Sequence, residues 1–230
     1  MGFLKRFFKS VFHENEMGHI ANSFEHLSEE QLEAHLDVGS YNGFELTEAV
    51  RPSFDLKVVP TQGFRREVYR DDQTGSTVPV LMGSATRSNL FETFMDLLDP
   101  LGTEVDVVLE SSHHGEGQKN GDMYREHIDL PVLKSILWDY EDLLLNDGCT
   151  GIAVLNPHQP LEVQFDEHKL LIVYGNELKP FEQAFIDRDV YPSPEMKFIT
   201  EAEHVHSSSQ RYQQQFEELR MRLGMDENYG

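Results

Sequence analysis

Residues 151–174 read GIAVLNPHQPLEVQFDEHKLLIVY, and this stretch decides the class of fold. Three apolar runs, at 151–155, 161–165 and 169–174, are separated by short polar segments. Runs of this length between turn-forming residues are typical of short β-strands, so we expect a three-stranded meander. The last run shows no polar alternation between positions 170 and 174, which predicts an interior strand covered on both faces of its sheet.

The sequence around this meander alternates between further strands and helices. A period of two predicts strands at 54–58, 64–70, 78–82, 103–110 and 196–200, and a period near 3.6 predicts helices at 88–99, 129–147, 177–187 and 212–223. We therefore expect an α+β fold, with a single mixed sheet of about six to seven strands packed with helices. The strand–helix–strand order at 78–110 indicates one parallel crossover, whereas the meander argues against a doubly wound sheet.

We predict two parts, a helical N-terminal extension at residues 1–52 and the α+β domain at residues 53–230. Ser28 and Gln31 form a capping-box pattern at the start of a helix that should end near Gly39. A short helix at 44–50 would stop before Pro52, because the residue before a proline disfavours helical geometry.

The first twelve residues, MGFLKRFFKSVF, differ in charge from the rest of the chain, since they carry three basic side chains and no acidic one. As a helix they would present one apolar face. Two interpretations follow: a peripheral membrane anchor, or a helix docked on the acidic body of its own domain. We favour the docked helix, because one short amphipathic segment holds a membrane weakly.

The chain is strongly acidic, with 41 acidic and 19 basic residues and a net charge of −22 at neutral pH. Such a field repels phosphates, so we predict no nucleic-acid binding and regard a basic protein as the natural partner. Cys149 is the single cysteine, so no disulfide forms within the chain. With no apolar run of about 18 residues, we expect a cytoplasmic protein, and we assign it no oligomeric state.

The segment 83–88, which joins a predicted strand to a predicted helix, is the candidate anion-binding site. Ser84, Thr86, Arg87 and Ser88 would bring hydroxyl groups, backbone N–H groups and a guanidinium together at a helix start. The segment lacks the glycine spacing and the lysine of a P-loop. The alternative is ordinary helix capping by Thr86 or Ser88, with Arg87 paired to an acidic side chain.

Two groups of histidines and acids invite a metal interpretation. The first contains Glu110, His113, His114, Glu116, Asp122 and His127, and the second Glu201, Glu203, His204 and His206. His204 and His206 would share one face if they lay on a strand. Neither group has the spacing of a dedicated metal motif, so we assign no metal and no cofactor. We expect Cys149 to be a buried small side chain rather than a nucleophile.

These observations support three hypotheses about function. The first is a non-enzymatic interaction module, regulatory or immunity-like, that binds a basic partner. The second is a small hydrolase or transferase that acts on an anionic substrate through residues Gly83 to Ser88 or through a histidine cluster. The third is a peripheral membrane protein anchored by residues 1–12. We favour the first, because no catalytic motif is present, and convergence of the histidines in space would favour the second.

Overall fold

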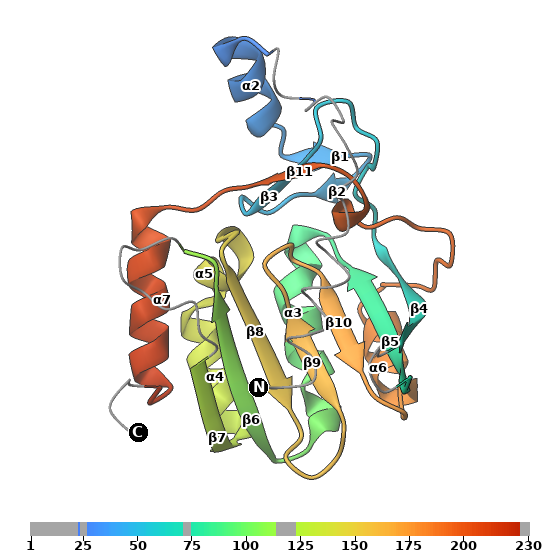
Figure 1. Ribbon diagram of the computed structural model, residues 1–230, viewed down its shortest axis with the longest axis vertical. Coiled ribbons are helices and arrows are strands. Elements are labelled where there is room, and N and C mark those ends of the chain that lie inside the picture. Colours follow the sequence, from blue (N-terminus) through green and yellow to red (C-terminus); the bar gives the residue numbers. More distant parts are fainter. Residues whose placement is uncertain (1–22, 24–26, 71–74, 114–122, 226–230) are drawn as a thin grey trace.

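The computed structural model describes residues 23, 27–70, 75–113 and 123–225. The fold is α+β, and its centre is a seven-stranded sheet in the order β4-β5-β10-β9-β8-β6-β7 (Figure 1). The strands are β4 (Gly63–Arg70), β5 (Thr77–Ser84), β6 (Glu104–Ser111), β7 (Met123–Asp129), β8 (Thr150–Leu155), β9 (Glu162–Phe165) and β10 (Leu171–Tyr174).

The predicted meander is present as β8, β9 and β10, which pair with one another in sequence order. Every pair of neighbouring strands in the large sheet is antiparallel. The chain leaves β5, passes through α3 (Arg87–Leu97), and returns as β6, with three strands of the sheet between β5 and β6. Because the pairings alternate, β5 and β6 run in the same direction, so the predicted crossover joins parallel strands that are not neighbours.

The core lies mainly between one face of this sheet and a layer of helices (Figure 1). That layer holds α3, α4 (Leu130–Asp139), α5 (Glu141–Asn146) and α6 (Lys179–Asp187), with α7 (Gln210–Arg222) at the side near β7. Leu171 and Val173 of β10 face this core, whereas Ile172 and Tyr174 pack on the other face with Phe198. β10 is thus an interior strand covered on both faces, as its unbroken apolar run predicts.

A smaller layer lies beyond one end of the sheet, at the top of Figure 1. It contains α2 (Glu29–Leu36), the hairpin of β1 (Ser40–Tyr41) and β2 (Phe44–Glu45), and the antiparallel pair of β3 (Val50–Pro52) with β11 (His204–His206). The predicted capping box is present, since Gln31 N–H donates to the Ser28 hydroxyl and Ser28 N–H donates to the Gln31 side chain.

The alternation of strand direction gathers several chain ends under this smaller layer. β5, β9 and β6 finish there at Ser84, Phe165 and Ser111, while β8 and β10 begin there at Thr150 and Leu171. Leu171 lies opposite Phe165, and Ser111 lies opposite Thr150, so these ends lie in register. The loops that follow or precede them are therefore brought together with β11.

Three predicted elements are wrong, and β7 was not predicted. Residues 54–58 form a turn instead of a strand, because the Ser53 hydroxyl accepts the Lys57 N–H and Leu56 adopts a positive φ of 50°. Residues 44–50 hold β2 and the start of β3 instead of a helix. Residues 196–200 run into the short 3-10 helix η2 (Ile199–Glu201). β7 is an edge strand with mostly exposed side chains, so it lacks the alternation that would have revealed it.

The helix predicted at 129–147 is divided in two at Tyr140, whose ψ of 20° is not helical. The short 3-10 helix η1 (Asp99–Leu101) ends the helix that precedes β6. No helix in the described ranges is long and apolar enough to cross a membrane. The segment at residues 1–12, for which we predicted an amphipathic helix, lies outside the described residues.

Candidate metal centre

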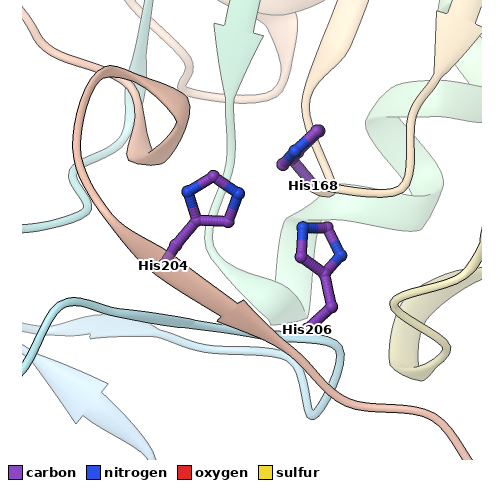
Figure 2. Close-up of side chains that lie close together, drawn as sticks. All are labelled: His168, His204 and His206. Carbon is purple, nitrogen blue, oxygen red and sulfur yellow. The ribbon is translucent and has the colours of Figure 1, made fainter. Parts of the chain in front are cut away.

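Three histidines converge under the small layer, and we call them the three-histidine cluster: His168, His204 and His206. Their rings are turned toward one another (Figure 2), and their ligand nitrogens all lie within 4.8 Å of each other. The ring centroids are 4.7 to 5.1 Å apart. A tetrahedral zinc ion would hold three such nitrogens about 3.4 Å apart, a separation that lies within the 4.8 Å limit of the cluster.

His168 comes from the tight turn that joins β9 to β10. Asp166 closes this turn, since its Oδ1 accepts the Leu170 N–H over 2.8 Å and its Oδ2 lies 2.9 Å from His168 Nδ1. Lys169 completes the turn with a positive φ of 64°. One aspartate therefore fixes both the backbone of the turn and the orientation of the His168 ring.

His204 and His206 come from β11, where period-two alternation places both on the same face. The expectation that they share a face if they lie on a strand is thus confirmed. Each ring is held by a backbone carbonyl, since His204 Nδ1 lies 2.9 Å from Ala202 O and His206 Nδ1 lies 2.7 Å from Gly148 O. A carbonyl only accepts hydrogen bonds, so both Nδ1 atoms carry the proton.

These contacts set the tautomer that a metal requires. A neutral histidine with its proton on Nδ1 presents the lone pair of Nε2, and metal-binding histidines usually donate their second nitrogen to a carboxylate or carbonyl. Burial lowers the pKa of both His204 and His206, which keeps these rings neutral near pH 7. Burial would also lower the pKa of His168, but the Asp166 carboxylate overrides it and raises that pKa.

Gly148 is the point at which β11 docks against the large sheet. Its N–H donates to Ser207 O over 2.8 Å, and Ser207 N–H donates to Ala49 O over 2.8 Å. A Cβ at position 148 would lie 2.4 Å from Ala49 O and 2.8 Å from Ser207 O. The φ of Gly148 is not positive, so glycine is needed here for the close approach of two backbones.

A cavity of about 40 Å³ lies beside His168. This volume holds about three water molecules. Its charged and polar lining includes Glu45, Ser84, Lys169 and Lys197. Burial lowers the pKa of Lys169 to about 8, so its ammonium group is largely protonated at neutral pH.

The predicted anion-binding residues are only partly gathered at this cavity. Ser84 lines it, whereas Thr86, Arg87 and Ser88 are not among its lining residues. The Thr86 N–H donates to the Gln62 side chain, and the Thr86 hydroxyl accepts the Glu45 N–H over 2.8 Å. Arg87 and Ser88 are exposed. Anion binding at residues 83–88 stays a prediction.

The other histidines and acids of the two predicted groups are separated in space or lie outside the described residues. His127 is exposed and pairs with Glu104, which raises the pKa of the imidazole. Glu201 pairs with Arg65, and Glu203 accepts a hydrogen bond from the Ser23 N–H. Glu110 lies at the end of β6, and His113 lies beside Asp147. His114, Glu116 and Asp122 fall at positions that are not described.

Sequence analysis therefore found two of the three histidines and missed His168. The signal for His168 was the segment 166–169, an aspartate, two polar residues and a lysine between two strands, which is a hairpin turn. This turn faces β11 because of the order of the strands in the sheet. The sequence of the turn itself carries no information about that order. No family model, curated protein or solved structure matches the chain.

Proposed function

We propose that the chain binds one zinc ion through the Nε2 atoms of His168, His204 and His206, and that it hydrolyses a small anionic substrate there. The observation that carries the proposal is the shared design of the three rings. Each Nδ1 lies against a carboxylate or carbonyl oxygen, and the rings face a common point.

Hydrolysis is the chemistry that this ligand set supports best. Zinc held by three protein ligands keeps a fourth position for water and lowers the pKa of that water to about 7. The cavity beside His168 would admit the reacting end of a substrate, and its lining carries two lysines, Lys169 and Lys197, against Glu45. The Lys197 ammonium would pair with a negatively charged group, such as a phosphate or carboxylate.

Metal analysis of the purified full chain tests the binding step. We expect His204→Ala and His206→Ala to lose one equivalent of zinc per chain relative to the parent. His158→Ala is the matched control, because His158 is exposed and lies outside the cluster. Equal zinc contents in the parent and the cluster variants would contradict the proposal.

Hydrolysis of p-nitrophenyl phosphate tests the chemical step, with the uncharged ester p-nitrophenyl acetate as the comparison. We expect turnover that a chelator abolishes, that zinc restores, and that His206→Ala lacks. Turnover that survives in His206→Ala would rule out the cluster as the catalytic centre. The proposed hydrolysis does not depend on a basic protein partner or on a cytoplasmic location. Both stay predictions from the composition of the chain.

A further inference from the structure

A second group of possible ligands lies beside the three-histidine cluster, and we call it the thiol cluster: His113, Asp147 and Cys149. His113 follows the end of β6, while Asp147 and Cys149 lie between α5 and β8. One ligand atom from each residue lies within 4.8 Å of the other two. His113 Nε2 is 3.0 Å from Asp147 Oδ2. The two clusters adjoin through Gly148, whose carbonyl holds the His206 ring.

One buried polar atom of the thiol cluster lacks a hydrogen-bond partner. Asp147 is 0% exposed and its Oδ1 has no partner within the described residues, whereas its Oδ2 lies 3.0 Å from His113 Nε2. Burial would raise the pKa of Asp147, but His113 and Ser208 lower it, so the carboxylate is ionised. The Ser208 hydroxyl is nevertheless not in hydrogen-bonding geometry with Oδ1. A buried carboxylate oxygen left without a partner is unfavourable, and a bound cation would satisfy it.

The remaining contacts hold the cluster in place without satisfying Asp147 Oδ1. The Thr150 hydroxyl donates to Asp147 Oδ2. Ser111 Oγ lies 2.7 Å from His113 Nδ1, so the second ring nitrogen of His113 is anchored as in the three-histidine cluster. His113 Nε2 is thereby directed at the carboxylate and away from the Ser111 hydroxyl.

The local charge favours a cation. Asp147, Asp166 and Glu167 contribute three carboxylates to this region, and Lys169 is the neighbouring buried cation, with its ammonium bound to Thr150 O. An imidazole, a carboxylate and a thiolate are all zinc ligands, whereas magnesium and calcium prefer oxygen ligands alone.

We propose that His113, Asp147 and Cys149 bind a second transition-metal ion, of the zinc type, at a site separate from the three-histidine cluster. The site is largely buried, so it stabilises the junction of α5 and β8, on which the Gly148 carbonyl depends. This proposal does not rest on the proposed function, because the two clusters share no ligand atom.

Cobalt substitution tests the thiol cluster directly. Cys149 is the only cysteine of the chain, so a thiolate-to-cobalt charge-transfer band can arise from this residue alone. We expect the full chain loaded with Co²⁺ to show the band and to bind two ions. Cys149→Ser should lose the band and one ion, whereas His204→Ala should keep the band and lose the other ion.

Each alternative outcome decides the question. No band in the parent chain overturns the second site, even if the histidine cluster binds cobalt. Loss of the band in His204→Ala, in a protein that unfolds cooperatively, overturns the separation of the sites. The alkylation rate of Cys149 in the parent gives a measurement that needs no variant: zinc should slow it at least tenfold, and an unchanged rate contradicts ligation.

Discussion

The three-histidine cluster and the segment at residues 83–88 lie at the same end of the sheet, but they use their polar groups in opposite ways. In the cluster, hydrogen bonds occupy one nitrogen of each ring and direct the other toward a shared point. In the segment, the amide and the hydroxyl of Thr86 bind Gln62 and Glu45 and hold the β5–α3 connection in place. Polar residues that are adjacent in sequence can thus be structural, while distant ones form the site.

The largest expected difference between these regions is in zinc affinity. His206→Ala removes a proposed ligand and should weaken zinc binding more than about 100-fold, since loss of a ligand exceeds the effect of losing a ligand's partner. Arg87→Ala, in the segment at 83–88, should leave the affinity within about twofold. Titration calorimetry of both variants measures this contrast. Similar losses in both would show that the segment takes part in the metal site.

Gly148→Ala tests the backbone contact that positions β11. The added methyl group meets Ala49 O and Ser207 O, so we expect a loss of about 1–3 kcal/mol in the free energy of unfolding together with weaker zinc binding. Gly39→Ala is the control, because a Cβ there has nothing within 4 Å. Denaturant unfolding of the two variants gives the comparison. An equal stability of Gly148→Ala and the parent would mean that β11 docks differently.

Asp166→Asn tests how much the orientation of the His168 ring contributes to zinc binding, because the variant leaves all three histidines in place. The variant keeps a side chain that can accept the Leu170 N–H, but it removes the charge beside His168. We expect zinc affinity to fall about 10–100-fold, as for other partners of metal-binding histidines. An affinity that does not change would show that the carboxylate serves only the turn.

Zinc affinity should also depend on pH in a defined direction. A proton competes with the metal for each Nε2, and Asp166 raises the pKa of His168 above 6.5, while His204 and His206 are lowered below it. As the pH decreases, His168 should therefore be the first of the three rings to take up a proton, and zinc affinity should begin to fall at that pH. Calorimetry between about pH 8 and about pH 5.5 measures this, together with the protons that zinc displaces. A flat profile would contradict ligation by His168.

The smallest expected effect concerns Thr86, where the hydrogen bond from the Glu45 N–H and anion binding make different predictions. Thr86→Val removes the acceptor for the Glu45 N–H and should cost about 1 kcal/mol of stability. If the hydroxyl is purely structural, the affinity for inorganic phosphate will not change. A clear loss of phosphate binding, followed by NMR, would restore residues 83–88 as an anion site.

Much of the fold was predictable because hydrophobic period and turn chemistry are local. The run at 170–174 identified β10 as an interior strand, and Ser28 with Gln31 marked the start of α2. Edge strand β7 and the turn at 54–58 were not predictable, since exposure and a side-chain hydrogen bond determine them. The same limit applies to the site: His204 and His206 share a strand, but His168 joins them only through the order of the sheet.

The most direct test is a crystal structure of the zinc-soaked chain, with anomalous scattering measured on both sides of the zinc absorption edge. We predict an anomalous peak about 2.0–2.1 Å from Nε2 of His168, His204 and His206. The Nδ1 atoms should keep their contacts with Asp166, Ala202 and Gly148. A structure with zinc bound elsewhere, and no peak between the three rings, would contradict the account.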